Sequence, residues 1–202
     1  MTSIETSPEP FPELLITLAS ASPRRRELLD QIQVSYAVHP ANIDETHIAG
    51  ETAEQFVKRL AQEKARFVIK ELPERPVLSA DTIIILEGQI LGKPESLQHA
   101  KEILNMLSGR THQVMTAVAI NDGEVEHVAL NSSEVEFAYI SDKQIDAYLK
   151  TGESQDKAGA YGIQGLAGQF IKNINGSYSS IMGLPLYETT ELLKLVGIEH
   201  LK

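Results

Sequence analysis

The feature that most constrains the fold is the junction at Ser20 and Ser22, where an apolar run passes directly into a helix start. Residues 14–18 are apolar except for one threonine and predict a buried strand. Ser22-Pro23 then has the form of a helix start, with Ser as N-cap and Pro at the first helical position. A strand that leads straight into a helix is the building block of α/β proteins, and such junctions are where these proteins bind ligands.

Three arginines, Arg24, Arg25 and Arg26, fill the first turn of that helix. This end is unfavourable for cations, because the helix dipole already places partial positive charge there. Cations placed where the helix dipole disfavours them indicate a functional site. Free backbone N–H groups, two serine hydroxyls and clustered guanidinium groups favour binding of a polyanion, above all phosphate. The alternative is a solvated basic turn in which Glu27 and Asp30 balance Arg26.

Composition narrows the function classes. The formal net charge of −10 argues against a general nucleic-acid binder, so no nucleic-acid polymer is expected as a partner. On such an acidic chain the arginine cluster is an isolated positive patch that fits one small anion. The chain has no cysteine, which excludes disulfides, thiolate chemistry and zinc sites built on cysteine. The six histidines show no spacing typical of metal ligands.

Length and hydropathy predict the domain organisation. A chain of 202 residues fits one domain better than two independent ones. We expect a flexible N-terminal tail over residues 1–13 and a single domain over residues 14–202. No apolar run approaches membrane-spanning length and residues 1–13 have no signal-peptide pattern, so we expect no membrane partner and a cytoplasmic location.

The hydrophobic periodicity of the remaining chain predicts alternating helices and strands. Helices are predicted at 23–31, 52–70, around 97–107, 141–151 and 184–196. The third of these has Leu97 facing the core, and the fourth begins with a capping box at 141–144. Strands are predicted at 34–38, 77–86, 89–91, 113–120, 125–139 and 170–174. Because hairpins alternate with βα crossovers, the fold class is α/β, with a mixed twisted sheet flanked by helices.

Asp81 is an acidic residue inside the strongest strand pattern of the chain, residues 77–86. Burying a lone carboxylate costs several kcal/mol unless a cation, a metal or hydrogen bonds compensate. Asp81 therefore either caps a strand end through backbone N–H groups, or it binds a divalent metal, accepts a proton from water, or does both. Asp44 and Glu45 lie in the loop after the second strand and offer a further carboxylate. Mg²⁺ typically binds one or two carboxylates together with phosphate oxygens.

Lys64 and Lys93 are the remaining cation candidates. Lys64 lies on the apolar stripe of the helix at 52–70, where it either extends its ammonium to solvent or serves a buried site. Lys93 stands between Gly92, which permits close backbone approach, and Pro94, which holds the segment rigid.

Gln164 lies with Lys157 in a loop that has a glycine at every third position from 159 to 168. Its amide can pair with the O4 and N3–H edge of uracil or thymine. Because the amide can flip, this argument alone does not exclude cytosine. The alternative is an ordinary surface glutamine.

Taken together, these motifs resemble those of the Maf family of nucleoside triphosphate pyrophosphatases. The matching segments are Ser20-Ala21-Ser22-Pro23-Arg24-Arg25, Asp44-Glu45, Glu63-Lys64-Ala65, Ser79-Ala80-Asp81-Thr82, Gly92-Lys93-Pro94, Leu107-Ser108-Gly109-Arg110-Thr111-His112, Asp156-Lys157-Ala158-Gly159-Ala160-Tyr161-Gly162-Ile163-Gln164-Gly165, Ile174-Asn175-Gly176-Ser177-Tyr178 and Gly183-Leu184-Pro185. They occur in order over nearly the whole chain after residue 14.

The resemblance implies hydrolysis of a nucleoside triphosphate to the monophosphate and pyrophosphate, with Mg²⁺ or Mn²⁺. It implies a fold like that of the inosine triphosphate pyrophosphatases, with two lobes around a cleft, and a homodimer. The sequence at 157–164 looks like the branch that acts on dTTP and UTP, with modified pyrimidine nucleotides as further candidates.

The resemblance also implies roles for individual residues. Asp81 is the proton acceptor, Arg24, Thr82 and Gln164 govern base preference, and Glu45, Lys64 and Lys93 surround the triphosphate and the metal. We add Ser20, Ser22 and Arg25 as phosphate-binding candidates and assign the metal to Glu45 and Asp81. Two other functions stay open at this point: a nucleotide-binding regulator of cell division without turnover, and a purine pyrophosphatase acting on ITP or XTP.

Overall fold

The computed structural model describes residues 15–199 of the chain. The expected tail, residues 1–13, lies outside the described residues. The elements follow in the order β1 (Ile16–Leu18), α1 (Pro23–Gln31), β2 (Tyr36–Val38), α2 (Ala53–Glu71), β3 (Val77–Leu86), β4 (Gln89–Leu91), α3 (Leu97–Leu107), β5 (Thr111–Asn121), β6 (Glu126–Phe137), α4 (Asp142–Leu149), η1 (Ala158–Ala160), η2 (Leu166–Phe170), β7 (Ile171–Asn175), α5 (Tyr178–Met182) and α6 (Leu186–Leu195).

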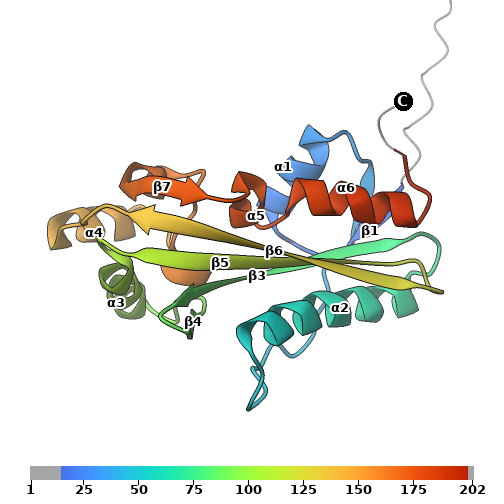
Figure 1. Ribbon diagram of the computed structural model, residues 1–202, viewed down its shortest axis with the longest axis horizontal. Helices are drawn as coiled ribbons and strands as arrows, with labels where there is room; N and C mark the ends of the chain where they lie inside the picture. Colours follow the sequence, from blue (N-terminus) through green and yellow to red (C-terminus); the bar gives the residue numbers. More distant parts are fainter. Residues whose placement is uncertain (1–14, 200–202) are drawn as a thin grey trace, which may run out of the picture.

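The strands form one mixed sheet, as the alternation of hairpins and crossovers predicts. Its order is β2-β1-β3-β5-β6-β7, and β4 pairs with β3 outside this path. β1 runs parallel to β2 and β3, whereas the other pairs are antiparallel. The long strands β3, β5 and β6 form the middle of the sheet (Figure 1). The expected fold class, α/β with helices flanking a mixed sheet, is confirmed.

Helices cover both faces of the sheet (Figure 1). α2 packs against β3 and β5 on one face, while α5 and α6 pack against β5 and β6 on the other. The burial of β3 alternates accordingly: Val77 and Ile83 pack with α2, and Leu78 and Ala80 pack with apolar residues of α1 and α6.

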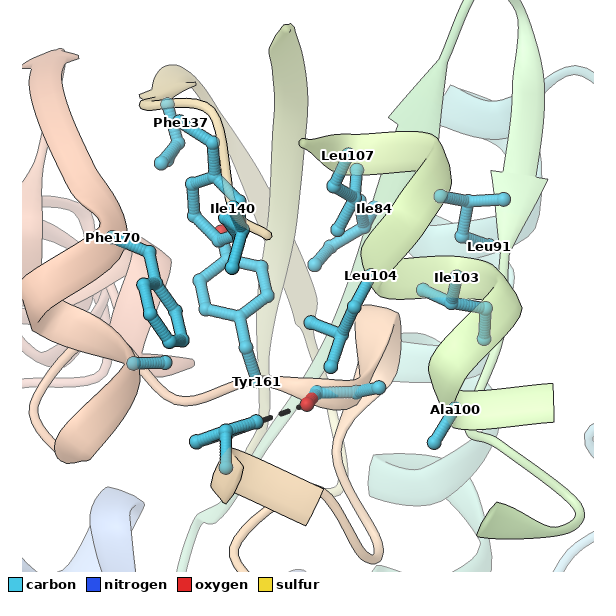
Figure 2. Packing of buried hydrophobic residues seen from close by; sticks show 14 of the residues in the cluster. Ile84, Leu91, Ala100, Ile103, Leu104, Leu107, Phe137, Ile140, Tyr161 and Phe170 are labelled. Atoms are coloured by element: carbon cyan, nitrogen blue, oxygen red, sulfur yellow. Dashed lines mark hydrogen bonds between the residues drawn. The ribbon is translucent and has the colours of Figure 1, made fainter. Parts of the chain in front are cut away.

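A third apolar cluster lies at the end of the sheet where α3 and the segment after α4 meet. Figure 2 shows the rings of Phe137, Tyr161 and Phe170 beside Leu104 and Leu107 of α3. The rings of Phe137 and Tyr161 meet edge to face, with centroids 4.8 Å apart. This cluster anchors the glycine-rich segment through Tyr161.

Several predicted bounds differ from the structure. β2 begins at Tyr36 rather than at residue 34, because Gln33 takes a positive φ of 58° and the chain is still turning there. The strand predicted to reach residue 139 ends at Phe137, and α5 was not predicted. Leu97 was expected in the core but is 57% exposed, because it begins α3 at the rim of the molecule. Within residues 15–199, no helix has the length and apolar character needed to cross a membrane.

Candidate active site

A pocket of about 560 Å³ opens beside β3, at the corner where β1 passes into α1. All ten residues predicted for the site line it: Ser20, Ser22, Arg24, Arg25, Glu45, Lys64, Asp81, Thr82, Lys93 and Gln164. These residues come from six separate stretches of chain, so the fold itself brings them together. Arg26 is exposed and is not among the lining residues, so the positive patch consists of two arginines rather than three.

The pocket lies against a gap in strand pairing along one edge of β3. β1 pairs only with Val77 and Leu78, and β4 pairs only from Ile84 onward. On the opposite edge, β5 pairs with β3 without interruption from Val77 to Ile85. In the described part of the chain no strand covers residues 79–83 on the pocket side. Asp81 and Thr82 fall in this gap, and their side chains alternate toward opposite faces of the sheet.

Lys64 joins the two carboxylates of the pocket. Its Nζ lies 2.7 Å from Oδ1 of Asp81 and 2.7 Å from Oε1 of Glu45. The side chains of Lys64 and Asp81 are only 9% and 11% exposed. The interpretation that Lys64 extends its ammonium to solvent is therefore wrong. The interpretation of Asp81 as a strand-end cap is also wrong, because Asp81 lies in the middle of β3 and pairs with an ammonium group.

Glu45 connects this ion pair with the mouth of the pocket, where its side chain is 44% exposed. Lys93 Nζ lies 3.9 Å from Glu45 Oε2. Burial alone acts to raise the pKa of the Glu45 carboxyl, but the hydrogen bond and charge of Lys64, with the charges of Lys93 and Arg25, hold that pKa below its ordinary value. Glu45 is therefore an ionised carboxylate at neutral pH.

Arg25 is fixed by two hydrogen bonds at the start of α1. Its Nε donates to the carbonyl oxygen of Gly183 at 2.8 Å, and its Nη1 donates to Oγ of Ser20 at 2.9 Å. Burial lowers the pKa of Arg25, while the charge of Asp81 acts in the opposite direction. Gly183 had no assigned role in the sequence analysis. It has a positive φ of 114°, which favours glycine, and it ends α5 beside Arg25.

Ser22 is the N-cap of α1 by position, as predicted, and Pro23 follows it. Within the described residues its side chain makes no capping hydrogen bond, while its backbone N–H donates to Ser20 Oγ at 3.2 Å. The first turn of α1 therefore presents polar groups to the pocket that the helix itself does not use.

Thr82 is supported from behind by groups that the sequence analysis did not identify. Its Oγ1 lies 3.0 Å from Oγ1 of Thr116, which donates to the carbonyl oxygen of Ser180 at 2.8 Å. The available signal was weak: Thr116 is a buried polar residue within an apolar run of β5. Its partner Ser180 lies in α5, which was not predicted.

The glycine-rich segment forms the wall of the pocket that carries Gln164, whose side chain is exposed toward the opening. Gly159 has a φ of 65°, and a Cβ there would collide with the side chain of Ile84. The hydroxyl of Tyr161 forms a hydrogen bond of 2.7 Å with Nε2 of the buried His112. Close packing at Gly159 and the buried Tyr161 thus hold this wall against the sheet.

Glu45 and Asp81 are the two acidic side chains of the pocket that share the ammonium group of Lys64, and we consider them as ligands for a metal. Among residues 15–199 no group of three or more histidine, cysteine or acidic side chains is arranged to hold an ion. Two oxygen ligands close enough to share one ammonium group do fit Mg²⁺ or Mn²⁺, because Mg²⁺ commonly binds one or two carboxylates and completes its shell with water and substrate phosphates.

The sequence of the chain matches one protein family and several relatives over most of its length. A model of the family described as "Maf-like protein" matches residues 15–196. The dTTP/UTP pyrophosphatase of Methylobacillus flagellatus is 50% identical over 185 residues, which cover 91% of this chain and 93% of that protein. The dTTP/UTP pyrophosphatase of Escherichia coli O157:H7 is 51% identical over 177 residues, covering 87% and 90%. Among solved structures, the Staphylococcus aureus Ham1 protein has a TM-score of 0.43 at 18% identity, covering 61% of this chain and 71% of its own.

Proposed function

The chain belongs to the Maf-like protein family, and on this premise we propose that it hydrolyses dTTP and UTP to the nucleoside monophosphate and pyrophosphate. Relatives at about half identity over most of both chains carry the name dTTP/UTP pyrophosphatase. The observation that carries the proposal is the meeting of two arginines, three lysines and three carboxylates in one pocket beside the gap in β3. Modified pyrimidine nucleotides are further candidate substrates. The role is removal of unwanted nucleotides from the pool.

The triphosphate binds over the corner between β1 and α1. Ser20, Ser22 and Arg25 surround this corner, where backbone N–H groups of the first helical turn favour phosphate. Lys93, exposed at the mouth, contacts the outer phosphates, and Lys64 contacts phosphate oxygens nearer to Asp81. Guanidinium and ammonium groups aimed at phosphate oxygens stabilise negative charge that develops as the anhydride bond breaks.

Asp81 accepts the proton of the water that attacks the α-phosphorus, and pyrophosphate leaves. Its place beside Lys64, on a strand paired along its whole opposite edge, holds the carboxylate in one position. Glu45 and Asp81 would hold Mg²⁺ or Mn²⁺, which when bound neutralises phosphate charge and favours attack by water.

Arg24, Thr82 and Gln164 lie around the part of the pocket that we assign to the base. Arg24 of α1 and Gln164 of the glycine-rich segment both line the pocket, and the Thr82 hydroxyl is oriented by Thr116. Burial lowers the pKa of Arg24. Three side chains with hydrogen-bonding groups, on rigid elements, are enough to read the edge of one pyrimidine.

We further propose that the enzyme acts in the cytoplasm as a homodimer. Support for an interface comes from α6, whose Tyr187 and Leu195 are large apolar side chains exposed on its outer side. Light scattering on the purified full chain tests this; a single monomeric species at micromolar concentration contradicts it.

A panel of nucleoside triphosphates tests the proposed function. Pyrophosphate release from UTP, dTTP, CTP, ITP, XTP and ATP is measured with purified protein, with and without Mg²⁺. We expect turnover of UTP and dTTP that requires the metal. Binding of UTP without pyrophosphate release would favour the regulator without turnover, and preferred hydrolysis of ITP or XTP would favour a purine pyrophosphatase.

A further inference from the structure

The wall of the pocket that carries Gln164 is a loop tied closed at its base by one carboxylate. Oε2 of Glu153 accepts from the backbone N–H of Leu166 at 2.8 Å, and Oε1 accepts from that of Ala167 at 3.3 Å. The Tyr148 hydroxyl donates to the same carboxylate at 3.1 Å. Glu153 therefore fixes where both ends of the loop stand, and the side chains between them keep one position relative to the pocket.

Lys157 is the cation of this loop, and it faces the end of the pocket where the base is assigned. Its Nζ donates to the carbonyl oxygen of Glu153 and, at 3.5 Å, to that of Gln155. An ideal Cβ on Gly162 would lie 3.2 Å from Cε of Lys157 and 3.4 Å from Oε1 of Gln164. The two side chains therefore lie next to each other over the same glycine, and both line the pocket.

Burial and the neighbouring charge of Arg24 lower the pKa of Lys157. The ammonium group of Lys157 thus lies close enough to the guanidinium of Arg24, from α1, to be affected by its charge, and both residues line the same pocket. An ammonium group has three donors and no acceptor. With two directed at carbonyl oxygens of its own loop, one N–H remains for a ligand.

Uracil and thymine differ from cytosine at the exocyclic group on C4 and at N3, which carries a hydrogen in uracil and thymine but not in cytosine. Uracil and thymine present an acceptor, O4, where cytosine presents a donor, its amino group. The amide of Gln164 can flip and so pairs with either edge. A lysine cannot exchange donor for acceptor, so it pairs with O4 and meets the amino group of cytosine donor to donor.

We propose that Lys157 is a specificity-determining residue that donates to O4 of uracil or thymine and excludes cytosine. This inference rests on the proposed function, because it assigns the base of the substrate to this end of the pocket. A half-buried donor that faces another donor instead of its acceptor is expected to lower relative activity toward CTP by about tenfold.

The test compares kcat/KM for UTP and CTP in the wild type, Lys157→Gln and Lys157→Met. Lys157→Gln keeps a group that can donate to the loop carbonyls but can also accept from the amino group of cytosine. We expect its kcat/KM for CTP to rise about tenfold and the ratio of UTP to CTP to approach one. Lys157→Met loses the donor and with it the clash with the amino group of cytosine, so its kcat/KM for UTP falls about tenfold while that for CTP does not fall. The matched control is Lys172→Met, which removes an exposed lysine of β7 paired with Glu136.

The rise for CTP is the decisive result, because damage to the loop cannot increase activity. If Lys157 held a phosphate instead, both nucleotides would lose kcat/KM equally and the ratio would not move. That result, or a wild type that hydrolyses UTP and CTP equally well, overturns the inference.

Calorimetric titration with UMP and CMP separates this inference from the proposed function. A protein that releases no pyrophosphate but binds UMP more tightly than CMP, with the difference lost in Lys157→Gln, contradicts the enzyme and supports the role of Lys157. Normal hydrolysis of UTP with no change of preference in either variant contradicts the role of Lys157 alone.

Discussion

Replacement of Lys64 by methionine tests the electrostatics of the pocket most directly. The change removes an ammonium group that lies 2.7 Å from both Asp81 and Glu45 and leaves a side chain of similar length. Removing one partner of a buried ion pair costs about 3–5 kcal/mol, because the other charge stays buried without compensation. Asp81 is almost fully buried, but Glu45 is half-exposed and retains Lys93, so we take the lower end, about 3 kcal/mol.

For a chain of this length, about 3 kcal/mol corresponds to a melting temperature about 6–12 °C lower. Urea unfolding at pH 7 measures the loss.

The double variant Lys64→Met/Asp81→Asn supplies the control, because it removes the charge that Lys64 compensates. We expect it to recover most of the lost stability at pH 7. A Lys64→Met protein as stable as the wild type, or a double variant as unstable as Lys64→Met, would refute the reasoning that Lys64 stabilises a buried carboxylate.

Three further predictions follow from individual contacts. Gly159→Ala forces a methyl group into the side chain of Ile84 at a positive φ and should lower the free energy of unfolding in urea by about 1–3 kcal/mol. No loss of stability would mean that the glycine-rich segment packs less closely against β3 than the structure shows. Burial lowers the pKa of His112 to about 4, so the stability that its neutral form contributes is complete above about pH 6.5 and is lost as the pH falls toward 4. His112→Leu should therefore flatten the decline in the free energy of unfolding over that pH range. An unchanged slope would exclude His112 as the source of the decline. Arg25→Met removes the hydrogen-bond donors to Ser20 and Gly183 together with one proposed phosphate contact, so KM for UTP should rise about tenfold or more. An unchanged KM would mean that the phosphates bind elsewhere.

Strong local signals predicted much of the fold correctly. Ser22-Pro23 and the apolar run before it predict β1 and the bounds of α1, and the run at 77–86 matches β3 residue for residue. Each of these signals lies within the element it predicts. α5 was missed for the same reason, since five residues carry too little periodicity to distinguish a helix from a turn.

The composition of the site was predictable residue by residue, but its arrangement was not. Whether Lys64 extends to solvent or pairs with Asp81 depends on how α2 lies across the sheet, which spacing along one helix does not contain. The gap beside Asp81 depends on β1 and β4 pairing with β3 only near its two ends. Likewise, the contact between Thr116 and Ser180 joins residues 64 apart in sequence.

Nucleotide turnover by Asp81→Asn tests the central claim most directly. The substitution keeps the size of the side chain and removes the proton acceptor, so pyrophosphate release from UTP should fall by about a hundredfold or more. Binding of UMP, measured by calorimetry on the same preparation, should stay within about threefold of the wild type, because we assign Asp81 to the reacting phosphate rather than to the base. Full hydrolysis of UTP by Asp81→Asn would contradict the account.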